Sequence, residues 1–248
     1  MKASNRPAAA DSLSGRIRRL DWRGILSSLD ERGYGTSGAG SPLLGEAECA
    51  SLVSLWTDPA RFRSRVDMAR HRFGEGEYRY FSRPLPRIVE QLREGLYRKL
   101  APAANAWMES LGEPRRFPAR LRDFVAECAA AGQPKPTPLL LRYEAGGYNC
   151  LHQDLYGEIA FPFQAMIPLS RPGADYAGGE FLLVEQRPRA QSAGTAILPA
   201  RGELVIFANR VRPARGARGA YRANVRHGAS RVLAGTRFAL AVIFHDAA

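Results

Sequence analysis

The chain has 248 residues, 45% of them hydrophobic, which is enough for one sizeable core but tight for two full domains. Its 36 Lys and Arg against 24 Asp and Glu give a net charge of +12, which favours a polyanionic partner, nucleic acid first and an anionic membrane surface second. An arginine-rich solvated surface would give the same balance.

Three cysteines, Cys49, Cys128 and Cys150, form an odd set without paired spacing, so we expect no disulfide framework and a reducing compartment. The first 19 residues are basic but have no apolar run of signal-peptide length. No stretch approaches the roughly 18 apolar residues that a membrane span requires. We therefore expect a cytoplasmic protein.

The first part of the chain divides into two regions. Residues 1–40 are predicted to form a basic, partly flexible segment with one short amphipathic helix, Ile17–Leu29. Residues 41–114 are predicted to form a helical support region, interrupted at 73–81 by an aromatic and basic segment that reads as a functional loop or short hairpin. The apolar positions at helical spacing are Cys49, Leu52, Val53 and Trp56, then Ile88, Leu92, Leu96, Tyr97 and Leu100.

Residues 115–248 have a different pattern, in which short β-type runs alternate with Gly and Pro. The absence of long helices between these runs predicts a sandwich or jelly roll and argues against a parallel α/β sheet. The predicted strands are Leu139–Tyr143, Gln164–Leu169, Glu180–Val184, Ala196–Leu198, Leu204–Phe207 and Arg237–Phe244.

A candidate metal site comes from the few histidines. His152 and Asp154 lie two residues apart, so on an extended backbone both side chains point to one side. His227, at another strand, would complete a two-His-one-carboxylate set, whose open positions suit iron(II) and oxygen chemistry. His245 competes as third ligand, but we favour a structural role for it. His71, between two arginines, is expected to be solvated or to face the substrate.

Arg237 supplies a cation near this predicted site. It follows His227 by ten positions, after Gly235, and a hairpin between their strands would place both groups at one mouth. An oxygenase that consumes 2-oxoglutarate needs such a cation for the distal carboxylate, and a guanidinium pairs bidentately with carboxylate.

Several motifs resemble those of known oxygenases. Tyr143 with His152-Gln153-Asp154 and His227-Gly228 is similar to the AlkB-type dioxygenases. Longer strings resemble a bacterial family of 2-oxoglutarate- and Fe(II)-dependent oxygenases proposed to demethylate damaged nucleic acid. These strings are Gly74-Glu75-Gly76-Glu77-Tyr78-Arg79-Tyr80-Phe81, Asn149-Cys150-Leu151-His152-Gln153-Asp154-Leu155-Tyr156-Gly157, Gly178-Gly179-Glu180-Phe181 with Glu185-Gln186-Arg187-Pro188-Arg189, and Arg226-His227-Gly228.

The resemblance implies an α+β fold, with a double-stranded β-helix (jelly roll) over 115–248 and the N-terminal helices packed on it. It implies Fe(II) as cofactor, 2-oxoglutarate and O2 as cosubstrates, and contact of Tyr143 with 2-oxoglutarate. The implied reaction hydroxylates and so demethylates alkylated bases in DNA or RNA. Two positions depart from the pattern: Leu141 stands where AlkB-type enzymes have Asn, and Ala239 where many relatives have Ser.

The nucleic-acid contacts are predicted from aromatic residues interleaved with cations. Tyr78, Arg79 and Tyr80 fit that description, as do Arg215 and Arg218 in the arginine-rich run before His227. The tyrosines would equally serve as a hydrophobic plug, and the arginines as a solvated surface. Two other functions stay open: a hydroxylase acting on protein (prolyl-type) or a small molecule with the same metal site, and a basic jelly-roll binding module with structural histidines.

Overall fold

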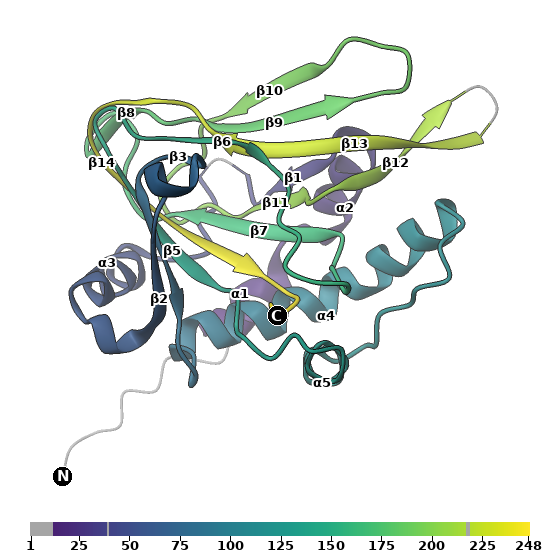
Figure 1. Ribbon diagram of the computed structural model, residues 1–248, viewed down its shortest axis with the longest axis horizontal. Helices are drawn as coiled ribbons and strands as arrows, with labels where there is room; N and C mark the ends of the chain where they lie inside the picture. Colours follow the sequence, from purple (N-terminus) through teal and green to yellow (C-terminus); the bar gives the residue numbers. More distant parts are fainter. Residues whose placement is uncertain (1–11, 39, 217–218) are drawn as a thin grey trace.

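Two antiparallel β-sheets face each other in the computed structural model, which describes residues 12–38, 40–216 and 219–248 (Figure 1). The larger sheet has the order β1 (Tyr34–Thr36), β11 (Val205–Ala208), β7 (Phe163–Pro168), β14 (Val232–Ile243), β5 (Leu139–Glu144), β4 (Glu77–Phe81) and β2 (Phe62–Asp67), with β8 (Tyr176–Gly178) paired to β14. The smaller sheet has the order β10 (Ala193–Ile197), β9 (Phe181–Gln186), β13 (Gly219–Ala229), β6 (Tyr148–His152) and β3 (Gly74–Glu75), with β12 (Val211–Gly216) paired to β13. This arrangement is the expected double-stranded β-helix.

Burial along the strands explains why the sheets stack. Every residue of β7 and β11 is buried, because helices cover one face of the larger sheet and the smaller sheet covers the other. Strand β13 alternates instead, with His227 on the buried face and Arg226 exposed. One face of the smaller sheet is therefore exposed to solvent. The other face is buried, and from it His227 points toward the larger sheet.

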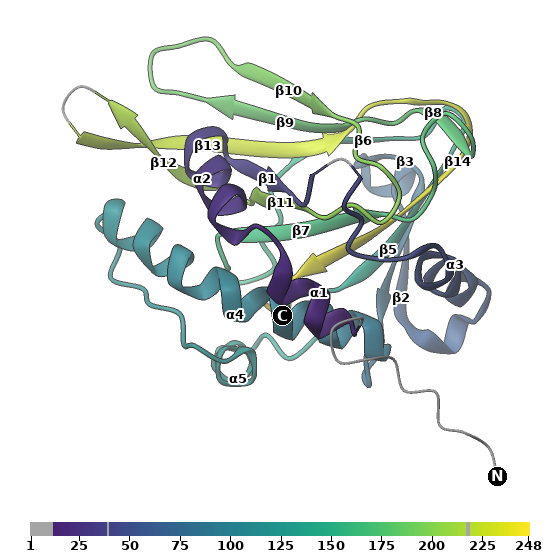
Figure 2. The same ribbon diagram turned by 180° about the vertical axis from the view of Figure 1, so that it is seen from behind.

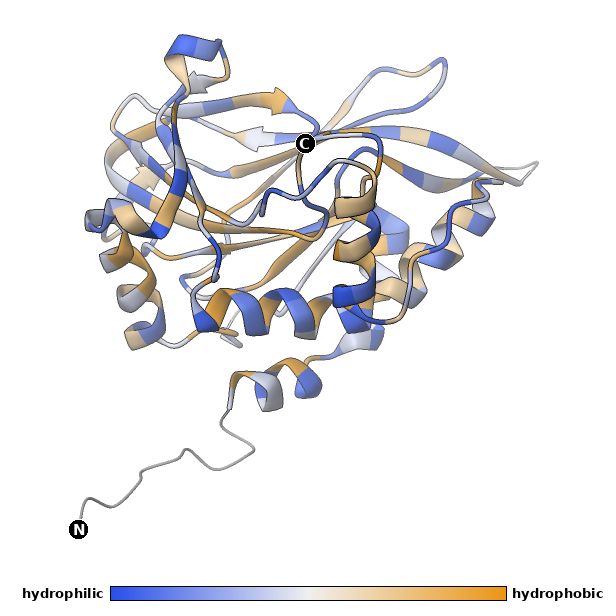
Figure 3. Cartoon of the chain, turned by 60° about the horizontal axis from the view of Figure 1, so that its bottom comes forward, coloured by the Kyte–Doolittle hydropathy of each residue, from blue (hydrophilic) through white to orange (hydrophobic). Residues whose placement is uncertain are grey.

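The helices lie on the outer side of the larger sheet (Figures 1 and 2). They are α1 (Leu13–Arg19), α2 (Trp22–Arg32), α3 (Glu46–Ser54), α4 (Arg87–Ser110) and α5 (Leu121–Ala130), with 3-10 turns at Leu55–Thr57, Pro59–Arg61 and Ala69–His71. Helix α4 buries one stripe at helical spacing, which includes Val89, Leu92, Leu96, Leu100, Ala104 and Trp107. Hydrophilic and hydrophobic bands accordingly alternate along the helices in Figure 3.

The N-terminal segment differs from the prediction. In place of one helix over Ile17–Leu29, the chain forms α1 and α2, because the side chain of Asp21 accepts a hydrogen bond from the Gly24 N–H and starts a second helix. Ile17 and Leu29 are buried in the main core, so residues 12–38 are an integral part of the fold. Residues 1–11, for which flexibility was expected, lie outside the described part of the chain.

The region 41–114 is not only a helical support. Strands β2 and β4, within residues 62–81, extend the larger sheet beyond β5, with Tyr80 opposite Leu139 in the β4–β5 ladder. The segment 73–81 is therefore mostly strand rather than loop. The arginine-rich run before His227 likewise forms a β-hairpin, β12–β13, which extends with the β9–β10 hairpin toward one side of the molecule in Figure 1. Among the described residues, no helix is both long and apolar enough to span a bilayer.

Candidate active site

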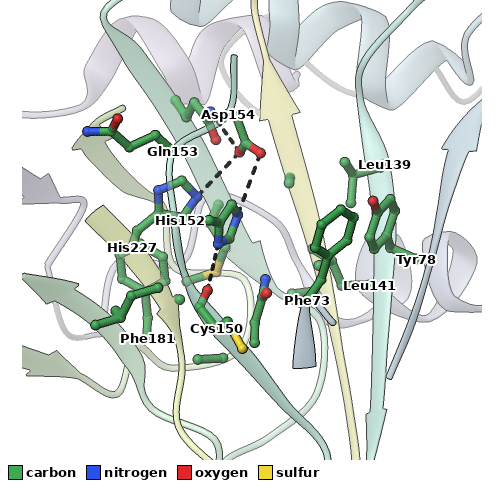
Figure 4. A pocket seen from close by; sticks show the side chains of 18 of the residues that line it. Phe73, Tyr78, Leu139, Leu141, Cys150, His152, Gln153, Asp154, Phe181 and His227 are labelled. Carbon is green, nitrogen blue, oxygen red and sulfur yellow. Dashed lines mark hydrogen bonds and ion pairs between the residues drawn. The ribbon is translucent and has the colours of Figure 1, made fainter. Parts of the chain in front are cut away.

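His152, Asp154 and His227 converge at one point between the two sheets (Figure 4). His152 on β6 and His227 on β13 are direct partners in the strand ladder, so their rings lie 4.3 Å apart, centroid to centroid. The carboxylate of Asp154 lies 3.5 Å from His152 Nε2 and 3.3 Å from His227 Nε2. The sheet register thus brings His227 next to His152 and Asp154, which lie far from it in the sequence.

The geometry of these groups fits a metal ion. Ligand atoms bound at about 2.1 Å and at right angles to each other are about 3 Å apart, close to the observed nitrogen–oxygen separations. The Nδ1 of His152 lies 2.8 Å from the Cys150 carbonyl, and donation of its proton there leaves Nε2 free for the ion. Among the described residues the group has only these three candidate ligands, so it leaves positions open for cosubstrates as an Fe(II) oxygenase site must.

Asp154 is ionised in this setting. Burial by itself would raise its pKa, but the hydrogen bond and charge of His227, with smaller effects from His152 and Tyr156, bring the pKa well below its usual range. His227 is also buried, and burial lowers its pKa despite the nearby carboxylate. An anionic carboxylate beside a neutral imidazole is the protonation state that binds a divalent cation.

Arg237 and Tyr143 form the second part of the site. Arg237 is 3% exposed, its Nε has no hydrogen-bond partner, and no described carboxylate forms an ion pair with it. Its guanidinium lies 5.5 Å from the ring centre of Tyr143 and 5.9 Å from that of Tyr176. Burial raises the pKa of Tyr143 to about 12, so its hydroxyl keeps its proton and can donate it to an acceptor. An unpaired buried cation is costly, so this arrangement is suited to an anionic ligand.

A cavity of about 440 Å³ connects the metal ligands with Arg237, and its size is ordinary for a small-molecule site. Its remaining wall is mainly apolar and aromatic, including Tyr78, Leu139, Leu141, Met166, Phe181, Phe207 and Ala239. The two positions that depart from the related oxygenases, Leu141 and Ala239, thus contribute apolar wall. Arg237 and Tyr143 offer polar groups to a ligand in this cavity.

The residues that were predicted to contact nucleic acid do not all lie at the cavity. Tyr78 lines the cavity, while Tyr80 is buried behind it against Tyr156. Arg79 points to the opposite face of β4, because successive side chains of a strand alternate. There it lies over the ring of Trp56, at 4.1 Å, and bonds to Glu77, so it is not part of the cavity.

Arg215 and His245 are not part of the metal-binding group. Arg215 is exposed on β12 and does not line the cavity, and Arg218 lies outside the described residues. His245 is buried outside the metal-binding group, where its Nδ1 accepts a hydrogen bond from the Phe161 N–H. Burial lowers the pKa of His245 to about 4, so it is neutral at neutral pH.

Sequence reasoning missed the apolar rim of the cavity. Phe73, Leu151 and Leu155 line it and are each more than 40% exposed. The ring of Phe73 stacks on His71, 5.4 Å away and inclined by 22°, next to Arg72 at the rim. The one available signal was the position of Phe73 at the start of the aromatic segment 73–81.

Comparisons with known proteins agree with this geometry. Residues 76–247 match the Oxygenase-NA family, described as "Oxygenase, catalysing oxidative methylation of damaged DNA". An uncharacterised protein of Mycobacterium tuberculosis is 51% identical over 168 residues, which cover 68% of this chain and 72% of that protein.

Solved structures share the fold at low sequence identity. A prolyl hydroxylase of Trichoplax adhaerens, in complex with a hypoxia inducible factor peptide, has a TM-score of 0.53 at 14% identity, covering 94% of this chain and 92% of the other. A 2-oxoglutarate-Fe(II) oxygenase family oxidoreductase of Burkholderia pseudomallei has a TM-score of 0.52 at 17% identity, covering 92% and 93%. A Pseudomonas putida prolyl-4-hydroxylase has a TM-score of 0.51 at 14% identity, covering 89% and 96%.

Proposed function

The chain belongs to the Oxygenase-NA family and is a 2-oxoglutarate- and Fe(II)-dependent oxygenase, and from this premise we propose that it demethylates alkylated bases in nucleic acid. The family's description names damaged DNA, and the surface around the cavity has the chemistry that such a substrate requires. The proposal covers the substrate class and the roles of individual residues.

In the proposed site, His152, Asp154 and His227 hold the metal, and Arg237 binds the distal carboxylate of 2-oxoglutarate with Tyr143 beside it. When bound, Fe(II) supplies the activation of O2, by which 2-oxoglutarate becomes succinate and CO2 and a substrate C–H becomes C–OH. One oxygen atom enters succinate and the other enters the new hydroxyl group. On an N-methyl base, the hydroxymethyl group then leaves as formaldehyde. The apolar wall around Leu141 and Phe181 keeps water from the reacting groups.

The stacked pair of His71 and Phe73 is the observation that carries the substrate proposal. It offers an exposed aromatic face at the rim of the cavity, and Arg70 and Arg72 place cations beside it. A nucleotide strand has flat bases and a phosphate at every residue, so it matches both features. A base next to the target would stack on Phe73 while the target base enters the cavity.

Cations on the solvent-exposed face of the smaller sheet also support this proposal. Arg215 and Arg226 are exposed on the β12–β13 hairpin, and neither forms an ion pair with a described acidic residue. Arg226 precedes the metal ligand His227 and points the opposite way. Unpaired cations so near the site would attract a phosphate backbone to it.

Turnover with defined substrates tests the proposal. We expect a single-stranded oligonucleotide with N-methylated bases to stimulate succinate formation and to release formaldehyde in equal amount, while the unmethylated oligonucleotide does neither. Phe73→Ala should weaken oligonucleotide binding about 10-fold or more, since stacking on an aromatic side chain contributes about 1–3 kcal/mol per base. Leu198→Ala, which removes another exposed apolar side chain outside the cavity, is the matched control.

Proline-containing peptides and small amines are the competing substrates in the same assay. Stimulation by one of these, with no response to any methylated oligonucleotide, would refute the nucleic-acid proposal and favour the hydroxylase alternative. The oxygenase assignment would stand in that case.

A further inference from the structure

Asp154 lies just beyond the end of strand β6, so hydrogen bonds of the β-sheet do not fix its position. Strand β6 ends at His152, and the chain from Gln153 to Tyr156 has no regular secondary structure. A metal ligand in such a segment needs other contacts to fix its position, because a displacement of a few tenths of an ångström changes the distance to the ion.

Asn209 supplies these contacts to the backbone. Its Oδ1 accepts a hydrogen bond from the Asp154 N–H at 3.0 Å, and its Nδ2 donates to the Asp154 carbonyl at 2.8 Å. Asn209 is 1% exposed, in the turn between β11 and β12, and its own N–H is bound to the Pro162 carbonyl at 2.9 Å. The amide side chain of Asn209 thus makes the two backbone hydrogen bonds that a neighbouring strand would otherwise make to Asp154.

The carboxylate of Asp154 is held as well. Gln164, buried on β7, donates from Nε2 both to Asp154 Oδ2 and to Asn209 Oδ1, each at 2.9 Å. The Tyr156 hydroxyl donates to the other carboxylate oxygen, Oδ1, at 2.6 Å. Apart from the two histidine contacts, each carboxylate oxygen therefore accepts one hydrogen bond from the protein and keeps further lone-pair capacity for an ion.

Gln153 completes the attachment from the other side. Its side chain points away from the metal-binding group in Figure 4 and donates to the carbonyls of Val225, at 2.7 Å, and Arg210, at 3.1 Å. Asn209 and Arg210 are consecutive, so the two residues after His152 are both fastened to the same turn. This explains why an amide side chain stands between the two ligands of the His-x-Asp motif.

We infer that Asn209 is a positioning residue for the metal site, which fixes the backbone of Asp154 and, through Gln164, the direction of its carboxylate. Without it, the Asp154 N–H and carbonyl and one Gln164 contact lose their partner, and the segment after His152 is free to shift. Metal affinity should fall, although Asn209 is neither a candidate metal ligand nor a residue that lines the cavity. The inference concerns the metal site and holds for any substrate.

Cobalt(II) binding to the metal-free full chain tests this, because Co(II) is stable in air-exposed buffers and its visible absorption reports on its ligands. We expect Asn209→Ala to weaken Co(II) binding about 10- to 100-fold at 10 °C, as is typical when a group that orients a metal ligand is lost. The shape of the absorption bands should change with it. Asn224→Ala, an exposed asparagine on β13, should bind Co(II) as the parent does.

Thermal unfolding of the metal-free variants separates positioning from stability. A lower melting temperature for Asn209→Ala with an unchanged Co(II) affinity and spectrum would overturn the inference and leave only a structural role. Gln164→Met keeps the side-chain volume while removing the donor to both Asp154 and Asn209, so it should also weaken Co(II) binding, even if Asn209→Ala does not fold. Unaltered Co(II) binding by that variant would likewise count against the inference.

Discussion

At the scale of single residues, the burial of Arg237 supports the proposal that this side chain binds an anion. Its guanidinium is enclosed beside Tyr143 and Tyr176 and lacks a carboxylate partner among the described residues. A ligand that supplies the missing charge would offset the cost of burying this cation, a role that an exposed arginine cannot have.

Replacement of this cation should change the requirement for 2-oxoglutarate. Hydrogen bonds to charged groups contribute about 1.5–3 kcal/mol, so Arg237→Ala should raise the KM for 2-oxoglutarate about 10- to 100-fold. Co(II) affinity should stay the same, because Arg237 is not a metal ligand. Arg142→Ala removes an exposed cation from the neighbouring strand β5 and serves as control. An unchanged KM for Arg237→Ala would contradict the assignment.

His245 predicts an acid-sensitive stability. Its pKa is lowered by burial from 6.5 to about 4 in the folded protein, so below pH 6.5 the unfolded chain binds the proton more readily than the folded one. Stability should therefore fall as the pH falls from about 6.5 to about 4, by at most about 3 kcal/mol from this residue.

Urea unfolding at several pH values measures this contribution. His245→Asn should be less stable at pH 8, because it leaves a cavity, but its stability should decline less steeply between pH 6.5 and 4.5. Part of the decline should remain, because His227 is also buried with a lowered pKa. Parallel curves for the variant and the parent would show that His245 does not titrate in this range.

At the scale of elements, the turn that follows β8 sets the position of Arg237. Gly179 has φ = +65°, and a Cβ built there would lie 2.9 Å from Arg237 Cδ. Any side chain at this position has to push against the stem of the arginine. Gly179 of the sequence motif therefore affects Arg237 through packing.

A matched pair of glycine variants isolates this effect. Gly173 also has a positive φ, +77°, but a Cβ there meets nothing within 4 Å. Alanine costs about 1–2 kcal/mol in this conformation at either position, so Gly179→Ala and Gly173→Ala should both lose stability. Only Gly179→Ala should raise the KM for 2-oxoglutarate. Equal kinetics in the two variants would mean that Arg237 adjusts without loss.

The strand pattern predicted a sandwich or jelly roll, and the resemblance of local motifs to known oxygenases implied the double-stranded β-helix. Local motifs also gathered His152, Asp154, His227 and Arg237 into one hypothesis. The sequence did not predict Asn209, whose contact with Asp154 depends on how two distant turns meet, and no spacing in the sequence encodes that. Arg79 is a different case. Successive side chains of a strand point to opposite faces, so Arg79 would have been placed on the other face from Tyr78 had residues 77–81 been recognised as a strand.

At the scale of the whole molecule, the cations behind the net charge of +12 are not equivalent. Several cations are neutralised within the fold: Arg93 by Asp246 in the core, and Arg212 by Glu185 under the β12–β13 hairpin. Arg215 and Arg226, exposed on the outer face of that hairpin, have no such partner among the described residues. Part of the surplus is therefore available on the sheet that carries His152 and His227.

The salt dependence of oligonucleotide binding tests whether that surplus is used. Each phosphate neutralised on a single strand contributes about 0.7 to the slope of log affinity against log salt, so Arg215→Ala with Arg226→Ala should reduce the slope by about 1.4. Arg120→Ala with Arg122→Ala, at the start of helix α5, removes the same charge from a surface away from the cavity and should leave the slope nearly unchanged. Equal slopes for both double variants would mean that net charge alone, and not its placement on the hairpin, attracts the strand. Uncoupled turnover of 2-oxoglutarate should be the same in all of them, because none of the four arginines lines the cavity.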